Sequence, residues 1–195
     1  MQSLNVQRLR ITFSKTGATR FIGHLDVART WERALNRAKL PVSYSQGFNR
    51  RPKVQFATAT SLGMTSQCEL VDVWLTERVE VSAAHAQIAA RMAPGLGIVA
   101  VEEVPLGGPA LQMLIRASTY TAVIAPDLLP YETLAERVAA VNSAEQLIRE
   151  RTSKGKAKNY DLRPLILSLT IAPTPTGEAL LTMELVLTPF PNRAA

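Results

Sequence analysis

The sequence of 195 residues contains a single cysteine, Cys68, and two histidines, His24 and His85. One cysteine excludes an intrachain disulfide, and it also excludes an iron–sulfur cluster held by several cysteines of this chain. A lone thiol fits a reducing compartment. The two histidines are far apart in the sequence, which argues against a dedicated zinc site. From these absences we expect neither a metal nor another cofactor.

Long apolar runs are also absent. No run reaches the roughly 18 residues that a membrane-spanning helix needs, and the N-terminus alternates polar and apolar residues, unlike the apolar stretch of a signal peptide. We therefore expect a cytoplasmic protein without a membrane partner. With 47% hydrophobic residues, the chain can still build one sizeable core or two small ones.

The charges are unevenly distributed along the chain. Residues 1–60 contain 11 Lys/Arg and 2 Asp/Glu, a balance of +9, whereas residues 61–150 contain 5 and 11, a balance of −6. A basic region of this kind often binds a polyanion, usually nucleic acid. The alternative is a solubilising surface, and charge alone does not decide between the two.

The first half of the chain has hydrophobic periods in the order strand, helix, strand, strand, helix, strand. The predicted strands cover residues 4–14, 52–62, 68–77 and 97–104, and the predicted helices cover residues 24–40 and 82–93. Ser82 is the candidate N-cap of the second helix. This order is the ferredoxin-like pattern.

The second half begins the same order after a junction, "PLGGPA", at residues 105–110. We expect a long strand, a helix, an ambiguous segment, a basic flexible loop and a hairpin, at residues 111–125, 130–142, 144–152, 153–159 and 165–187 respectively. No second closing helix follows. The predicted fold is therefore α+β, with two ferredoxin-like units in tandem at residues 1–104 and 111–195, the second one incomplete at its C-terminal end.

The first helix carries the clearest signal. Arg29, Arg33 and Arg37 are four residues apart and line one stripe, where like charges cost a few tenths of a kcal/mol per pair. An external polyanion would offset this repulsion, and a guanidinium binds phosphate through two hydrogen bonds. The alternative is an ordinary solvated face. The apolar face of the same helix is predicted to consist of Leu25, Ala28, Trp31, Leu35 and Ala38.

The loop "YSQGFNRRPK", residues 44–53, follows this helix and combines cations with aromatic side chains. Such a mixture suits unpaired RNA, because cations neutralise phosphates and aromatic rings stack on bases. Tyr44 and Phe48 would stack, although each is as plausible as a core anchor of the loop. The predicted polar contacts are Gln46 and Asn49 to base edges and Arg50, Arg51 and Lys53 to phosphates.

Two further basic segments are candidate phosphate contacts. "SKTGATR", residues 14–20, would hold an anion with its backbone N–H groups, Lys15 and Arg20. "KGKAKNYDLRP", residues 154–164, is the other, and a mobile surface loop is its alternative interpretation. Its candidate contacts are Lys154, Lys156 and Lys158.

His24 is a weak catalytic candidate. An imidazole beside a basic helix would serve as a general acid on RNA. No second catalytic group is apparent in the sequence, so a capping or hydrogen-bonding histidine is the favoured interpretation.

The segment "RFIGHLDVARTWERALNRAKLPVSYSQGFNRRPKVQFATATSLGMTSQCELVDVWL" resembles the radical SAM-linked domain of unknown function, and "KGKAKNYDLRPLI" is similar to the second motif of that family. That domain occurs alone or attached to a B12-binding-type radical SAM protein. Arg50 stands where family members commonly have proline. The resemblance implies a bacterial protein that acts near RNA, because members tend to be encoded beside ribosomal-protein and RNA-processing genes.

These observations predict an RNA-binding accessory domain whose partners are tRNA, rRNA or ribosome-associated RNA and a radical SAM protein. The chain lacks the CxxxCxxC signature and is therefore not itself the radical SAM enzyme. Two alternatives stay open. One is a metal-independent ribonuclease that uses His24, and the other is a docking module that binds a radical SAM partner through its acidic middle region.

Overall fold

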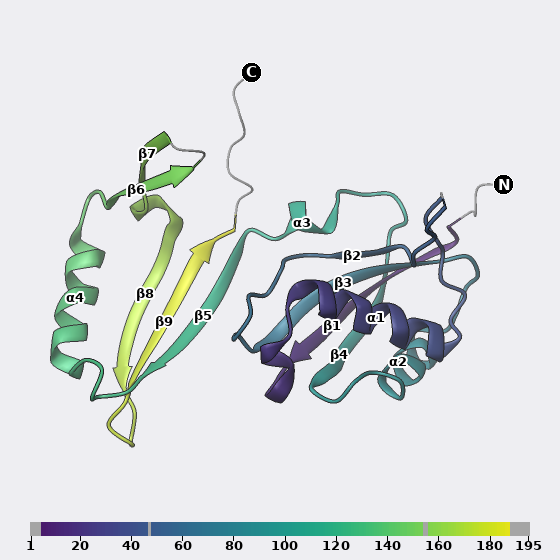
Figure 1. Ribbon diagram of the computed structural model, residues 1–195, viewed down its shortest axis with the longest axis horizontal. Coiled ribbons are helices and arrows are strands. Elements are labelled where there is room, and N and C mark those ends of the chain that lie inside the picture. Colours follow the sequence, from purple (N-terminus) through teal and green to yellow (C-terminus); the bar gives the residue numbers. More distant parts are fainter. Residues whose placement is uncertain (1–4, 47, 154–155, 188–195) are drawn as a thin grey trace. The chain divides into compact units, whose positions relative to one another are not determined.

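The computed structural model describes residues 5–46, 48–153 and 156–187. The chain divides into two compact units, Met1–Leu114 and Ile115–Ala195. Both units are mixed α/β structures with antiparallel sheets, and together their described residues contain four α-helices (Figure 1).

The first unit has the predicted order of strands and helices. Its elements are β1 (Gln7–Lys15), η1 (Gly17–Phe21), α1 (His24–Ala38), β2 (Val54–Phe56), β3 (Ser66–Leu75), α2 (Val81–Ala89), β4 (Leu96–Val104) and α3 (Leu111–Leu114). The four strands form one antiparallel sheet in the order β2-β3-β1-β4. Strand β1 is therefore paired on both sides.

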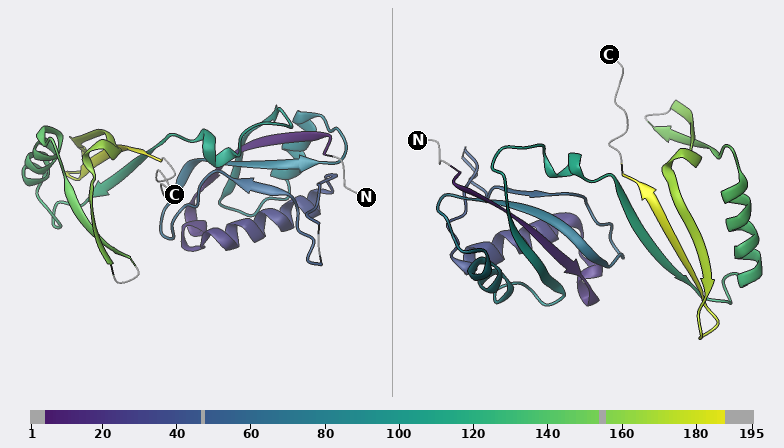
Figure 2. Two further views of the ribbon diagram at one scale, coloured as in Figure 1. Left: turned by 90° about the horizontal axis from the view of Figure 1, so that it is seen from above. Right: turned by 180° about the vertical axis from the view of Figure 1, so that it is seen from behind.

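The core of this unit lies between the sheet and the two longer helices. Alternate residues of β1, namely Leu9, Ile11 and Phe13, are buried in it. Trp31 of α1 packs edge-on against Phe13, with ring centroids 5.0 Å apart. Figure 2 shows α1 running along one side of the sheet. Because large rings fill the space between β1 and α1, the helix is fixed at this position on the sheet.

The buried face of α1 differs in part from the prediction. Trp31, Leu35 and Ala38 are buried as expected, but Leu25 is 71% exposed and its place is taken by Val27. Residues two apart on a helix point to different sides, so burial of Val27 leaves Leu25 outside. The predicted cap of α2 is also wrong: the first turn closes on Glu80, whose carbonyl accepts the Ala84 N–H at 2.9 Å, and Ser82 lies inside the helix.

The opposite face of the sheet carries a buried ion cluster. Asp72 of β3 has no exposed side-chain surface, and it accepts hydrogen bonds from Arg8 Nε and Arg10 Nε at 2.9 Å each. The hydrogen bond to Asp72 raises the pKa of Arg10. Arg8 is 3% exposed, and its guanidinium lies 4.8 Å from the centroid of the Trp74 ring.

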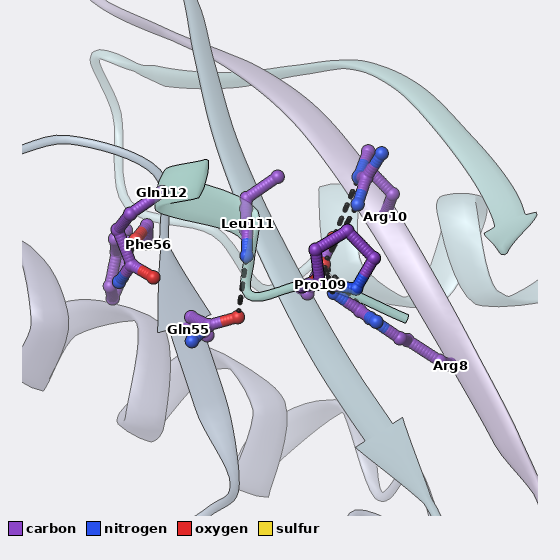
Figure 3. Close-up of polar contacts among 8 residues, drawn as sticks. Arg8, Arg10, Gln55, Phe56, Pro109, Leu111 and Gln112 are labelled. Atoms are coloured by element: carbon purple, nitrogen blue, oxygen red, sulfur yellow. Dashed lines mark hydrogen bonds and ion pairs between the residues drawn. The ribbon is translucent and has the colours of Figure 1, made fainter. Parts of the chain in front are cut away.

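The segment that follows β4, residues 105–114, covers part of this polar face. The Pro109 carbonyl lies 3.5 Å from Arg8 Nη2, and the Leu111 N–H donates to Gln55 Oε1 at 2.9 Å (Figure 3). Gln112 Nε2 donates to the Phe56 carbonyl at 2.8 Å, and the Leu111 side chain is fully buried. The strand predicted at residues 111–125 is confirmed only over Ala117–Ile124, because Leu111 packs within the first unit as part of α3.

The second unit contains β5 (Ala117–Ile124), α4 (Tyr131–Ser143), β6 (Ile148–Ser153), β7 (Lys156–Asp161), η2 (Arg163–Leu165), β8 (Ile166–Pro173) and β9 (Ala179–Val186). Its described strands form a three-stranded sheet, β5-β9-β8, and a separate hairpin, β6-β7. The predicted hairpin of β8 and β9 is confirmed. The basic loop predicted at residues 153–159 is instead largely in the β6–β7 hairpin, where antiparallel pairing satisfies its backbone. A tandem ferredoxin-like repeat is not confirmed.

We expect Asp72→Ala to destabilise the protein by about 3–5 kcal/mol, because removal of the carboxylate leaves two guanidinium groups without their buried partner. Asp26→Asn is the matched control, since the exposed pair between Asp26 and Arg29 contributes less than about 1 kcal/mol. Urea unfolding of the full chain measures both changes. A similarly small loss of unfolding free energy in the two variants would show that the buried ion cluster does not stabilise the sheet.

Candidate functional site

The arginine stripe lies on the exposed side of α1. Arg29, Arg33 and Arg37 are all exposed, as predicted. Arg29 Nη1 lies 3.2 Å from Asp26 Oδ1, and Arg37 Nη2 donates to the Arg91 carbonyl at 2.8 Å. Arg33 makes no side-chain hydrogen bond or ion pair with the residues that the structure describes. Its guanidinium is therefore free to bind an anion.

The basic loop lies along this helix. Residues Tyr44 and Pro52 form an isolated antiparallel bridge that closes the loop. The Tyr44 hydroxyl donates to Asn36 Oδ1 at 2.6 Å, and Arg51 Nη1 lies 4.0 Å from Glu32 Oε1. Both partners are on α1, so the loop lies beside the arginine stripe.

The two aromatic residues of the loop have different environments. Phe48 is fully exposed, with a relative accessibility of 113%, so its interpretation as a core anchor is wrong. Tyr44 is half-buried against the hydrophobic core, and the Arg50 guanidinium lies 5.9 Å from the centroid of its ring. Tyr44 therefore anchors the loop, and Phe48 alone presents a whole ring to solvent. Gln46 and Asn49 are exposed, whereas Gly47 lies outside the described residues.

Lys53 is exposed but points toward another part of the unit. Its Nζ lies 4.9 Å from the centroid of the Trp74 ring. Trp74 is two residues from Asp72 on β3, so it belongs to the polar face of the sheet. We therefore separate Lys53 from the stripe and the rest of the loop.

The anion-binding segment predicted at residues 14–20 does not have the expected geometry. Lys15 is 1% exposed, because it occupies the last core-facing position of β1. The backbone N–H groups of Thr16 and Thr19 are already bonded, to the Gly95 and Thr16 carbonyls at 2.8 and 3.2 Å. Arg20 is exposed, and its guanidinium lies 4.5 Å from the centroid of the Phe21 ring.

The second basic segment contains a structural clamp. Asp161 Oδ1 accepts the N–H groups of Leu147 and Arg163 at 2.7 and 2.9 Å. The Arg163 side chain donates to the carbonyls of Ala144 and Ile166 at 3.2 and 3.0 Å. These contacts join the β6–β7 hairpin to the end of α4 and the start of β8. The hydrogen bonds from Leu147 and Arg163 lower the pKa of Asp161.

The lysines of this segment are placed only in part. Lys156 lies in β7, and Lys158 in the same strand is exposed. Lys154 lies outside the described residues. All three remain predicted phosphate contacts of the second unit.

A small pocket opens where β1 ends beneath the first turn of α1. It is lined by Phe13, Lys15, His24, Val27, Phe56, Thr58, Thr60 and Glu69. Lys15 Nζ donates to the Ser61 carbonyl at 3.4 Å, a long hydrogen bond. The Glu69 carboxylate accepts the hydroxyls of Thr60 and Thr58 at 2.5 and 3.5 Å. The His24 ring meets Phe56 edge-on, with centroids 5.2 Å apart.

Sequence reasoning did not find this pocket. His24 appeared to lack any chemical partner, whereas the fold places Lys15 and Glu69 in the same recess. One signal was present: Lys15 continues the alternation of Leu9, Ile11 and Phe13, which predicts an inward side chain. The contribution of Glu69 depends on the pairing of β3 with β1, which the sequence does not specify residue by residue.

No group of three or more His, Cys, Asp or Glu side chains in the described part of the chain is arranged to hold a metal ion. No helix in that part of the chain is long and apolar enough to cross a membrane.

The fold and these sites define a two-unit α/β chain with a basic helix-and-loop surface and a polar pocket in its first unit. The chain belongs to a bacterial family described as "uncharacterized protein conserved in bacteria (DUF2344)", which matches residues 8–189. No curated protein matches the sequence.

We expect acid to weaken the clamp at Asp161. A carboxylate whose pKa is lowered on folding contributes stability above its unfolded pKa, and this contribution is lost as the pH falls through the folded value. Asp161→Asn should therefore remove part of the acid dependence of the second unit's stability. Denaturant unfolding of both proteins between neutral and strongly acidic pH, followed by a fluorophore attached to that unit, measures this dependence. Identical pH profiles would contradict the assigned clamp.

Proposed function

We propose that the chain is an RNA-binding accessory domain that binds unpaired RNA on its basic surface. We define the basic surface as the exposed side of α1 together with the described loop residues between Tyr44 and Pro52. Its proposed phosphate contacts are Arg29, Arg33, Arg37, Arg50 and Arg51.

The exposed ring of Phe48 carries this proposal. A phenylalanine without any burial gains nothing from folding, and its ring is available to stack on a base. Phe48 is followed within three residues by Arg50 and Arg51. A ring beside cations offers one stacking surface for a base and charges for the adjoining phosphates.

The charges of the basic surface are only loosely compensated. The Arg51 pair with Glu32 is at the 4.0 Å limit of an ion pair, and Arg33 has no acidic partner in the described part of the chain. Exposed pairs of this kind contribute little to folding and are readily exchanged for phosphate contacts. Binding of RNA would therefore cost few intramolecular interactions.

The other face of the first unit's sheet is less suited to RNA. Some RNA-binding domains stack bases on the open face of a four-stranded sheet. Here that face holds the buried cluster of Arg8, Arg10 and Asp72 and is covered in part by the segment that contains Pro109 and Leu111. The helix side, with its exposed arginines, is the better candidate.

Two finer assignments belong to the same proposal. We interpret both units as ferredoxin-like, because their sheets share one order of pairing. In the first unit β1 pairs with β3, and β3 pairs with β2; in the second unit β5 pairs with β9, and β9 pairs with β8. In chain order, the β6–β7 hairpin is then an insertion between α4 and β8 of an incomplete unit. We also propose that the domain acts beside a radical SAM enzyme in the bacterial cytoplasm, on the support of the sequence resemblance alone.

We expect Phe48→Ala to weaken binding of an unstructured RNA oligonucleotide by about 1–3 kcal/mol, the contribution of one base stacked on one ring. The melting temperature should stay unchanged, because the ring is not packed. Val99→Ala, which shortens another exposed apolar residue of the unit, is the matched control and should bind like the wild type. Fluorescence anisotropy titration at fixed salt measures the affinities.

If wild-type binding is established and Phe48→Ala has the same affinity, Phe48 does not contact the RNA. The RNA should be recovered intact after the titration. Cleavage that disappears in His24→Ala would instead favour the ribonuclease alternative.

A further inference from the structure

The first strand of the second unit has a neighbour on one side only. In the first unit, β1 is paired antiparallel with β3 on one side and with β4 on the other. In the second unit, β5 is paired antiparallel with β9 alone and lies at one edge of the sheet, with β8 at the other (Figure 1). No strand in the described part of the chain pairs with the free side of β5. Alternate backbone N–H and C=O groups of β5 therefore point away from the sheet.

The edge strands of the first unit carry features that block further pairing. Strand β2 is three residues long, and the carbonyl of Phe56 accepts a hydrogen bond from Gln112 Nε2 at 2.8 Å. Strand β4 contains two adjacent carboxylates, Glu102 and Glu103, and a bulge in its pairing with β1. Short length, charge and bulges each protect an edge from pairing with another chain.

The other edges of the second unit are protected in the same ways. Strand β8 ends at Pro173 and has a shift of register in its pairing with β9. Its Leu169 carbonyl accepts a hydrogen bond from Asn142 Nδ2 of α4 at 3.0 Å. Both strands of the β6–β7 hairpin carry charged side chains.

Strand β5 has none of these protective features. Its eight residues, "ASTYTAVI", include no charged residue and no proline, and its register with β9 is regular from end to end. Thr, Tyr, Val and Ile are residues that favour strands. A regular, uncharged edge of this length is a site at which a further strand can add.

The apolar residues near this edge are incompletely covered. Tyr120 and Ala122 of β5 lie opposite Met183 and Leu181 of β9, and all four side chains are only half-buried. No residue of β5 is buried, whereas α4 packs against β8, at the other edge of the sheet. A strand added beside β5 would cover the outer side of Tyr120 and Ala122.

We propose that the free edge of β5 pairs with β5 of a second copy of this chain, so that the two three-stranded sheets join into one. A twofold axis relates two copies of a strand in antiparallel sense, which is the sense in which β1 is paired with its second neighbour, β4. Because β5 carries no charge, self-pairing opposes no like charges. The same pairing of β4 with itself would bring four carboxylates to the joint.

The dimer is tested by sedimentation equilibrium of the full chain over a range of concentrations. The wild type should show a monomer–dimer equilibrium. Thr119→Lys/Thr121→Lys places like charges opposite one another near the twofold axis and should raise the dimer dissociation constant at least about tenfold. Both threonines are exposed, so the variant should stay folded, as judged by its circular dichroism. Ser168→Lys/Thr170→Lys adds the same charge at exposed positions of β8 and is the matched control.

Cross-linking locates the contact without adding charge. In a Cys68→Ser background, Thr121→Cys chains should form covalent dimers with a short bismaleimide, because residues 121 of the two copies lie close to the axis. Ser168→Cys chains, with the thiol on β8, should stay monomeric under the same conditions. Cross-linking at both positions alike, or at residue 168 alone, would place the contact elsewhere and overturn the proposal.

A wild-type protein that stays monomeric at every concentration would also overturn it. Amide hydrogen exchange then identifies the other possible occupants. Protected β5 amides in the monomer would show that residues of the same chain outside the described part cover the edge, and unprotected amides would leave the edge to a strand of another protein. Equal dissociation constants of the wild type and Thr119→Lys/Thr121→Lys would show that a dimer forms without β5.

Discussion

The alternation of side chains along β1 is the constraint on which the first unit depends. This strand is paired on both sides, so each of its residues must face either the helices or the polar side of the sheet. Leu9, Ile11 and Phe13 build the core against α1, whereas Arg8 and Arg10 meet Asp72 on the reverse. A shift of the strand by one residue would exchange the two sets and bury the arginines in the core.

The same alternation creates the pocket. Its next inward position after Phe13 belongs to Lys15, at the edge where the core ends and α1 begins. A lysine at that position places a charge at the base of a recess rather than on the surface. The pocket and the core are thus products of one strand register, and α1 contributes to the pocket with its first turn and to the basic surface with its exposed side.

Elements with a strong hydrophobic periodicity were predictable from the sequence, and elements without one were not. The helix α1 and the hairpin of β8 and β9 followed from their apolar patterns, because burial of one face dominates their energy. The β6–β7 hairpin did not, since its lysine-rich residues carry no apolar alternation. Its position depends on the hydrogen bond from the Leu147 N–H to Asp161 and on the one from Arg163 to the Ala144 carbonyl. Tyr44 and Phe48 have similar sequence surroundings, and only the tertiary contacts of Tyr44, its packing against the core and its bond to Asn36, distinguish the anchor from the exposed ring.

Mapping of the bound RNA on the full chain tests the central claim most directly. In an isotope-labelled protein titrated with an unstructured oligonucleotide, the largest NMR shift changes should occur at Arg33, Phe48 and Arg50, with none on the polar sheet face around Trp74. Charge-driven contacts also require these changes to diminish at high salt. Changes confined to Trp74 and Lys53, or none at Phe48 at saturating RNA, would contradict an RNA interface formed by α1 and its loop.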